Sequence, residues 1–385
     1  MSDDWQQGGF GLYVHWPFCQ AKCPYCDFNS HVTAHIDQNI WAQAYVQELR
    51  RVGAQTGGRV LNSIFFGGGT PSLMQPKTVA AVIDEAQDIW TFANDIEITL
   101  EANPTSVEAA RFQGYRSAGV NRISMGIQAL NDDDLKRLGR LHSVAEAQAA
   151  FEIAHQCFER ISFDLIYARQ DQSLAQWEAE LTQALNMAAD HLSLYQLTIE
   201  DGTAFGARHK AGALRGLPGE NTSADMFELT QDLCRAHGLP AYEVSNHARP
   251  GAESRHNMIY WTAGDYVGIG PGAHGRLTLE RQRYATESTM APGAWLANVK
   301  SGSGESTRIA LSRAEQAEEY LIMGLRLRQP LYIDRYRTLA ENELSPDALT
   351  SLTELGMLTF DNEQISITDQ GFMVLNAVIE NLSAD

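Results

Sequence analysis

Residues 13–27 read YVHWPFCQAKCPYCD and place Cys19, Cys23 and Cys26 in a CxxxCxxC pattern directly after a predicted strand. Three thiols this close in sequence can converge on one point, and soft thiolate ligands suit an iron–sulfur cluster or a zinc ion. Three cysteines on a four-iron cluster leave one iron without a protein ligand, which favours chemistry over a structural role. A zinc ion would need a fourth ligand, for which His15 or His31 is available.

The composition indicates an intracellular globular protein. A chain of 385 residues is long enough for two domains. The 29 basic and 48 acidic residues give a net charge of −19, which argues against sequence-independent nucleic-acid binding. The first ten residues lack the basic start and apolar run of a signal peptide, and no stretch of about 20 apolar residues could span a membrane. We therefore predict a cytoplasmic location.

Short apolar segments alternate with longer amphipathic segments between residue 10 and about residue 200. The apolar segments have the length of buried strands, and they are residues 11–15, 63–66, 96–100, 122–127, 162–167 and 191–198. Helical patterns such as 36–55 and 76–90 lie between them. This alternation predicts βα units and a parallel sheet. Six units predict an α/β fold with an incomplete (β/α)6 barrel, whose functional residues gather at the C-terminal ends of the strands.

The pattern divides the chain into three parts. Residues 1–205 hold the βα units, residues 206–300 are predicted to extend the barrel, and residues 301–385 are predicted to form a small helical C-terminal domain. In that domain an amphipathic helix at 311–328 and further helices precede two short strands at 358–360 and 365–367, which indicates a winged-helix-like unit. Such a unit can bind DNA, but Glu315, Glu318 and Glu319 on its first helix disfavour nucleic acid as a partner.

Glycine and polar residues follow the second and third predicted strands. The glycines of GGGTPS, residues 67–72, expose backbone N–H groups and let a ligand approach closely, although a plain turn into a helix is the structural alternative. Glu101 ends the third strand, where a buried carboxylate needs a cationic or hydroxyl partner. The alternative is a solvated Glu101 with Asn103 as a helix cap.

The later strands also end in polar residues. Gln128 offers both a donor and an acceptor, and Arg140, twelve residues later, presents a planar fork for a carboxylate. Asp164 interrupts an apolar strand and must be paired or functional, and Thr198 and Glu200 can line the same opening. Taken singly, each is equally compatible with a solvated side chain or one at the edge of the core.

A histidine with two large aromatic neighbours occurs in residues 255–261, RHNMIYW. His256 can ligate haem iron while Tyr260 and Trp261 pack on the macrocycle. The alternative is an aromatic cluster that closes the barrel edge around a hydrogen-bonded histidine. A glycine run, DYVGIGPGAHG, follows at residues 265–275 and contains His274.

The cysteine motif after YVHxPFC, together with GGGTPS, resembles the radical S-adenosylmethionine (SAM) family. Within that family the chain is similar to the branch of oxygen-independent coproporphyrinogen III oxidases and haem chaperones, from Tyr13 through the tail. The resemblance implies that Cys19, Cys23 and Cys26 hold a 4Fe–4S cluster and that SAM binds the free iron. The cofactor contacts that we predict on this basis are Tyr13, Tyr25, Gly68, Gly69, Thr70, Glu101, Gln128, Arg140, Asp164, Thr198 and His274.

Two functions compete within that branch. Residues 256–261 match HNxxYW, which resembles the signature of haem-binding members and implies that His256, Asn257, Tyr260 and Trp261 bind haem. Phe28 stands where the porphyrinogen oxidases carry a fourth cysteine, CxxxCxxCxC. We therefore favour a haem chaperone that delivers haem to respiratory haemoproteins over a coproporphyrinogen oxidase of porphyrin biosynthesis. We assign no catalytic residue, and SAM cleavage, a homodimer and a peripheral membrane contact are left undecided.

One loop departs from the family pattern. Relatives read DLxxGLPxQ, whereas residues 168–172 are ARQDQ, although Asp164 and Gln172 keep the register. The absence of Gly and Pro changes the backbone freedom at a strand exit. We make no prediction for the shape of this loop.

Overall fold

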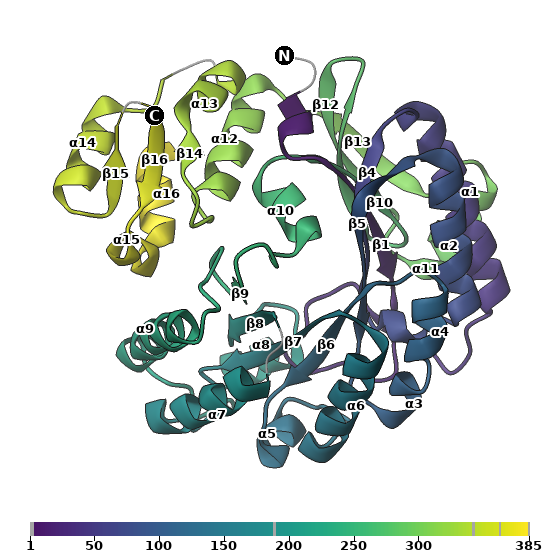
Figure 1. Cartoon of the computed structure of the whole chain (residues 1–385), viewed down its shortest axis with the longest axis horizontal. Coiled ribbons are helices and arrows are strands. Elements are labelled where there is room, and N and C mark those ends of the chain that lie inside the picture. The colour runs from purple at the N-terminus through teal and green to yellow at the C-terminus, as the bar shows by residue number, and fades with distance from the viewer. Residues whose placement is uncertain (1–3, 188–189, 341–342, 362, 384–385) are drawn as a thin grey trace.

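The computed structural model describes residues 4–187, 190–340, 343–361 and 363–383, and one large curved sheet dominates it (Figure 1). Eleven strands make up this sheet, in the order β13 (Glu305–Ala310), β12 (Gln282–Ser288), β11 (His274–Leu279), β10 (Asp265–Ile269), β1 (Phe10–Trp16), β4 (Val60–Gly68), β5 (Thr91–Ala102), β6 (Arg122–Gln128), β7 (Arg160–Tyr167), β8 (His191–Gln196) and β9 (Asn246–Ala248). Strands β13 and β9 form its two edges, so the sheet is open.

The six predicted strands correspond to β1 and β4 to β8, which run parallel in chain order. The predicted α/β class is therefore confirmed. A further parallel strand, β10, pairs with the free edge of β1 and was not predicted. The sequence pattern did not indicate this strand because it contains glycine. A Cβ on Gly268 would lie 1.9 Å from the carbonyl oxygen of His274. Glycine inside a strand often marks such a close backbone approach.

Helices cover the outer face of the sheet in Figure 1. They include α1 (Gln38–Thr56), α2 (Pro76–Ile89), α4 (Phe112–Ser117), α5 (Asp132–Arg137), α6 (Val144–Cys157) and α7 (Leu174–Met187). Side chains alternate between the two faces of a strand, so Trp16 of β1 packs edge-on against Trp41 of α1, with ring centroids 5.7 Å apart. Tyr13 and His15 lie on the inner side instead, together with the short helix α10 (Arg255–Trp261).

The sheet continues as an antiparallel ribbon beyond β10. Strands β11, β12 and β13 pair in turn, and α11 (Pro292–Lys300) lies between the last two in sequence. The ribbon ends at Ala310, ten residues beyond the domain boundary that we placed after residue 300. Asp265, which is fully buried at the start of β10, pairs with Arg59 at 2.8 Å and with Arg283 at 3.1 Å. These ion pairs fasten the ribbon to the parallel strands.

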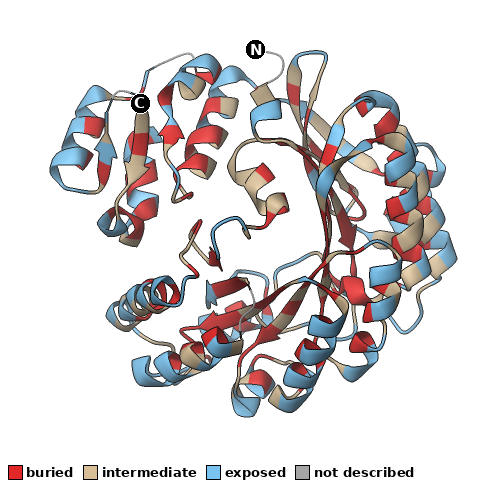
Figure 2. Cartoon of the chain, viewed as in Figure 1, coloured by how far each residue is buried: buried red, intermediate tan, exposed pale blue. Residues whose placement is uncertain are grey.

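A separate hydrophobic core defines the C-terminal domain. It contains α12 (Arg313–Gly324), α13 (Ile333–Leu339), α14 (Pro346–Glu354), α15 (Asp369–Met373), α16 (Leu375–Ser383) and a small sheet in the order β14 (Leu331–Tyr332), β16 (Gln364–Ile367), β15 (Leu358–Phe360). Figure 2 shows buried residues on the inward faces of these helices and exposed residues on the outward faces. Among the described residues, none of the helices combines the length and the apolar character required to cross a bilayer.

Candidate cluster and cofactor site

The loop after β1 carries three free, partly buried cysteines. Two short strands, β2 (Phe18–Cys19) and β3 (His31–Val32), pair in parallel across this loop. Thr70 Oγ1 donates to Cys19 Sγ and Arg140 Nη1 donates to Cys23 Sγ, each at 3.5 Å. Burial raises the pKa of Cys19 and of Cys26, and the charges of the neighbouring thiols add to this increase. The three thiols are therefore close enough to influence one another's charge.

The two histidines that could complete a zinc site have other partners. His15 uses both ring nitrogens, Nδ1 with the Tyr13 hydroxyl at 3.0 Å and Nε2 with the Asn29 carbonyl at 2.9 Å. His31 Nε2 lies 3.1 Å from Asn29 Oδ1. Across the described ranges, no three His, Cys, Asp or Glu side chains are grouped as ligands of a single metal ion.

The thiols line a pocket of about 430 Å³ at the C-terminal ends of β4 to β8. This is the edge of the sheet at which we expected functional residues to gather. The pocket brings together most of the predicted cofactor contacts, which are Tyr25, Gly68, Gly69, Thr70, Glu101, Gln128, Arg140, Asp164 and Thr198, with Cys19, Cys23 and Cys26. Phe28 also lines it, with a side chain that is 55% exposed.

The glycines after β4 let this strand end pack closely on the cysteine loop. Gly68 has a φ of +108°, a region that favours glycine, and a Cβ there would lie 2.7 Å from the His15 ring. A Cβ on Gly69 would lie 2.7 Å from the Phe18 carbonyl oxygen. Any other residue at either position would displace the loop that holds the thiols.

The backbone N–H groups of this stretch are not free for a ligand. Gly69 N–H donates to the Trp16 carbonyl at 2.7 Å, and Thr70 N–H donates to the Phe18 carbonyl at 2.8 Å. Our prediction that these groups are exposed was therefore wrong, because they fasten the cysteine loop to β4. The stretch still lines the pocket through Gly68, Gly69 and Thr70.

Two carboxyl groups are buried together in the pocket. Burial, and then the charge of Asp164, raises the pKa of Glu101 to about 8, although the Gly68 N–H donates to the carboxyl. Burial raises the pKa of Asp164 to about 6, while Gln128 and Ser193 donate hydrogen bonds that oppose the increase. The pair thus holds a proton near neutral pH, and a cationic ligand would favour its release.

Replacing Glu101 by glutamine should remove a pH dependence of stability. The pKa of Glu101 in the folded protein lies above its unfolded value, so its contribution is full below the unfolded pKa and is lost as the pH rises through 8. Each pKa unit corresponds to about 1.4 kcal/mol. Because Glu101 lines a pocket that is open to solvent, the full shift overstates the effect. We expect Glu101→Gln to be about 2 kcal/mol more stable than wild type at about pH 8.5 and equal to it at about pH 5, with both proteins free of metal.

Urea unfolding at the two pH values measures this difference. Glu228→Gln, at an exposed position, provides the control and should follow wild type at both pH values. Parallel stability curves for wild type and Glu101→Gln would contradict the shifted pKa of Glu101.

Arg140 joins the cysteine loop to the strand ends. Its Nη2 donates to Asn103 Oδ1 and to the Gly126 carbonyl, the latter at 2.7 Å, while Nη1 reaches Cys23. Its Nε is buried without a partner. Asn103, which we had considered only as a helix cap, therefore lines the pocket and positions this guanidinium. No local pattern indicated this role, because an asparagine that caps a helix and one that positions an arginine look alike after a strand.

Gln128 is placed by an irregular strand end. It has a φ of +73°, unusual for a residue with a side chain, and the pairing of β6 with β7 shifts between Met125 and Gln128. Ser124 and Tyr195 line the same pocket and were not predicted. Both lie inside segments that the sequence predicts as strands, so no pattern distinguished them from ordinary strand residues.

Two predicted contacts do not line the pocket. Tyr13 packs on the inner side of β1, with its ring stacked 6.4 Å from Phe65 and 6.2 Å from His256. His274 is 62% exposed at the start of β11 and lies 3.7 Å from Glu287. Neither side chain makes the predicted direct contact in this pocket, because the Tyr13 ring stacks against Phe65 and His256 and the His274 side chain is exposed to solvent.

His256 is buried inside the curved sheet and not at an accessible surface. Its Nδ1 lies 2.7 Å from Ser63 Oγ, its Nε2 bonds to the Tyr260 hydroxyl, and its ring stacks on Phe65 at 5.0 Å. Burial, and then the charge of Arg122, lowers the pKa of His256 to about 3. This arrangement corresponds to the alternative considered above, a hydrogen-bonded histidine in an aromatic cluster.

The other residues of the HNxxYW sequence surround this cluster. Asn257 Nδ2 donates to the Tyr242 hydroxyl at 3.4 Å, and the ring of Tyr260 meets that of Tyr266 at 4.4 Å. Trp261 ends α10 and is partly buried. No residue of this motif lines the pocket that holds the thiols.

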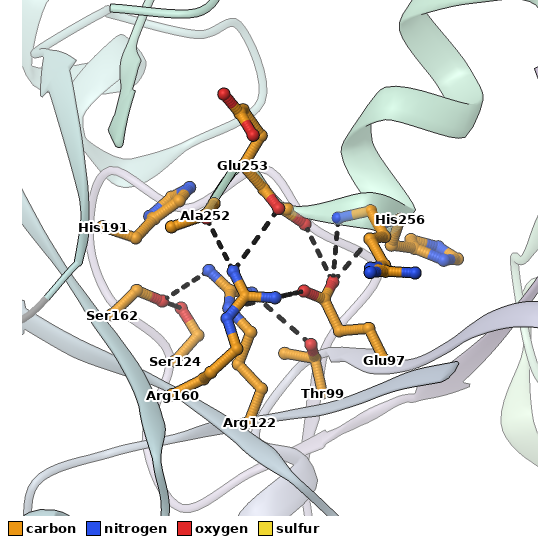
Figure 3. A network of polar contacts seen from close by, with 12 residues as sticks. Glu97, Thr99, Arg122, Ser124, Arg160, Ser162, His191, Ala252, Glu253 and His256 are labelled. Carbon is orange, nitrogen blue, oxygen red and sulfur yellow. Dashed lines mark hydrogen bonds and ion pairs between the residues drawn. The ribbon is translucent and has the colours of Figure 1, made fainter. Parts of the chain in front are cut away.

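A network of buried charges holds the N-terminus of α10 (Figure 3). Glu97 Oε1 accepts the backbone N–H of Arg255 at 3.0 Å, and Glu97 Oε2 accepts from Arg160 at 2.7 Å. Arg122 lies beside them, 4.0 Å from Glu97, and donates to Ser162 at 2.9 Å. Figure 3 shows Glu97 between the two guanidinium groups and the start of α10. The motif is therefore fixed to the sheet through one carboxylate.

The loop that departs from the family pattern is well anchored. Ala168, in place of the usual glycine, has a φ of +56°. Arg169, only 4% exposed, pairs with Asp134 at 2.9 Å and with Glu180 at 2.6 Å. Gln172 accepts the Arg169 N–H at 3.1 Å. An ion-pair network around the buried Arg169 guanidinium therefore holds this loop in place.

Comparisons with known proteins agree with this geometry. Residues 13–181 match the Radical SAM superfamily, and residues 311–374 match the HemN C-terminal domain. "Radical S-adenosyl methionine domain-containing protein 1, mitochondrial" of Bos taurus is 37% identical over 96% of this chain and 86% of its own length. The chain belongs to the radical SAM superfamily, in the branch that carries a HemN C-terminal domain.

Two further proteins show which members of this branch the chain is similar to. The protein named "Heme chaperone HemW" of Escherichia coli (strain K12) is 37% identical over 97% of this chain and 98% of its own length. The solved structure of coproporphyrinogen III oxidase (HemN) from Escherichia coli superposes with a TM-score of 0.81, at 21% identity, over 98% of this chain and 90% of that chain. At that identity the second match bears on the fold alone.

The family implies a 4Fe–4S cluster and SAM, and the pocket fits both. Three thiols line it together, and one guanidinium, that of Arg140, lies against Cys23 with an unpartnered buried Nε. A carboxyl pair, Glu101 and Asp164, offers negative charge for a cationic group. These donors suit iron through sulfur and a zwitterionic ligand through opposite charges.

Proposed function

We propose that this protein is a haem chaperone, which binds haem together with a 4Fe–4S cluster and SAM and passes haem to respiratory haemoproteins in the cytoplasm. The observation that carries the proposal is the 37% identity to a protein named "Heme chaperone HemW" over nearly the whole of both chains. The pocket supports the same choice, because Phe28 and not a fourth cysteine lines it beside Cys26.

Different residues of the pocket would hold the cluster and SAM. Cys19, Cys23 and Cys26 would ligate the cluster, and Arg140 would stabilise the Cys23 thiolate by its charge. When bound, the cluster and SAM supply one-electron reductive chemistry. Glu101 and Asp164 would face the positive part of SAM.

The haem side of the proposal involves α10. His256 remains the candidate iron ligand, supported by the similarity of residues 256–261 to the signature of haem-binding members. Ligation would break its hydrogen bonds to Ser63 and Tyr260 and would withdraw its ring from Phe65. We therefore expect haem ligation to be slow, because the helix must first leave its site.

Haem titrated into the anaerobically reconstituted protein should give a saturable shift of the Soret band. His256→Ala should weaken the affinity by at least about tenfold, since an axial ligand is lost. The exposed His274 provides a matched control, and His274→Ala should bind as wild type does. Wild-type protein that binds no haem would overturn the proposal, and equal binding by His256→Ala would exclude His256 as the ligand.

The same preparation tests the alternative function. Incubated with coproporphyrinogen III, SAM and a reductant, it should yield no protoporphyrinogen. Clear turnover would establish a coproporphyrinogen III oxidase instead of a chaperone.

A further inference from the structure

A second cavity, of about 860 Å³, lies between the parallel strands and the C-terminal domain. One side consists of the ends of β7 and β8, residues 244–245 before β9, and α9 (Glu220–Ala236). The other side consists of α15 and the start of α16, with Arg326 just after α12. In Figure 1, α9 and α15 face each other at this side of the molecule. The volume of the cavity lies within the range of about 300–1,000 Å³ that is typical of small-molecule sites.

Apolar side chains line both sides of this cleft. They come from the barrel side as well as from the C-terminal domain and are Leu197, Leu217, Phe227, Val244, Phe372 and Leu375. Val374, also in the lining, is 46% exposed. An apolar ligand that spanned the cleft would cover surface that both domains leave open to water.

One cation in the cleft has no carboxylate partner. Arg326 Nη1 donates to the Ile322 carbonyl at 2.7 Å, and Nη2 donates to Asn376 Oδ1 at 3.4 Å. Within the described residues it forms no ion pair, whereas Arg328, two positions later, pairs with Asp369 at 2.6 Å. Burial lowers the pKa of Arg326, and the charge of Glu243, which forms no ion pair with it, opposes this decrease only in part. A carboxylate ligand would supply the remaining compensation through a strong, directional pair.

The cleft adjoins the cofactor pocket. Leu197 and Thr198, directly after β8, line both cavities. A ligand in the cleft would therefore lie one residue layer from the site assigned to SAM. The residues of α10 do not line the cleft.

We propose that this cleft binds a tetrapyrrole, with the macrocycle between the two apolar walls and a propionate carboxylate on Arg326. The inference rests on the proposed haem function and adds to it a docking site that is separate from α10. The apolar walls would recognise the rings and Arg326 would recognise a carboxylate, and neither contact requires iron. The cleft would therefore hold the porphyrin before or apart from ligation by His256.

Iron-free protoporphyrin IX tests this site, because it lacks the metal that His256 would ligate. Binding to the full chain with a reconstituted cluster is followed by porphyrin fluorescence. Arg326→Gln should weaken binding about tenfold, as expected for loss of a charge-assisted hydrogen bond. Ala224→Trp, which fills the cleft from α9, should weaken it at least as much. Arg337→Gln, which removes an exposed arginine of the same domain, should bind as wild type does.

The dimethyl ester of protoporphyrin provides a measurement that needs no stable variant. Wild type should bind the ester about tenfold more weakly than the free acid, and Arg326→Gln should not distinguish the two. Palmitate at equal concentration should not displace the porphyrin, and displacement would overturn the assignment to a ring system. If the cleft variants bind protoporphyrin as wild type does, the cleft assignment is wrong while the haem function stands. If wild type binds neither haem nor protoporphyrin, both fail.

Discussion

Cys19→Ala should lose nearly all of its iron after anaerobic reconstitution, together with the visible absorption of the cluster. The thiol lines the pocket beside Cys23 and Cys26 and accepts a hydrogen bond from Thr70. Alanine leaves two protein ligands, which cannot hold a cluster that normally has three. We expect the iron content per chain to fall by at least about tenfold relative to wild type. Iron analysis and the absorption spectrum measure the two losses independently.

Cys157→Ala is the matched control for this experiment. Cys157 is also a partly buried free thiol, but it ends α6 on the outer side of the sheet and lies outside the pocket. Its replacement should leave iron and absorption unchanged. If Cys19→Ala keeps both the iron and the spectrum, the assigned ligand set is wrong.

Glu97→Gln should lower the free energy of unfolding by about 3 kcal/mol, as is typical when one partner of a buried ion pair is removed. Glutamine keeps the shape but loses the charge that faces Arg160 at 2.7 Å and Arg122 at 4.0 Å. Arg122, only 2% exposed, would then lose the carboxylate with which it forms an ion pair. The N-terminus of α10 would lose its anionic acceptor as well. The midpoint of urea unfolding measures the change.

An exposed pair separates this effect from the loss of any carboxylate. Asp201 lies 2.9 Å from Lys210, and the two side chains are 82% and 67% exposed. Asp201→Asn should cost less than about 1 kcal/mol, because exposed ion pairs contribute little. Equal losses for the two variants would contradict the role of burial at Glu97.

The sequence was most informative where local pattern and tertiary structure agree. The six strands were predictable because each is a short apolar run between helices, and their C-terminal ends had to share one edge of the sheet. Cys19, Glu101 and Asp164 therefore meet in one pocket, as their positions after or within those strands indicated. Strand β10 was not predicted because Gly268 allows the close approach of the backbone at His274, which no local pattern reveals.

The residues that were misplaced show the limit of such patterns. A histidine beside aromatic residues has the same sequence pattern as a haem ligand or as part of a core, and only the partners Ser63 and Phe65, which are distant in sequence, reveal that His256 is buried. His274 follows a glycine run whose turn directs it to solvent. The two carboxylate partners of Arg169 come from separate helices, which no local pattern indicates.

The charge of Arg122 acts on ionisable groups on two sides of the molecule, the cofactor pocket and the surroundings of α10. Burial raises the pKa values of Glu101 and Asp164 on the cofactor side and lowers those of His256 and His191 on the side of α10, and in all four cases the positive charge of Arg122 acts to lower the pKa. Any rearrangement that shifts or neutralises this guanidinium would make all four groups hold their protons more tightly at once.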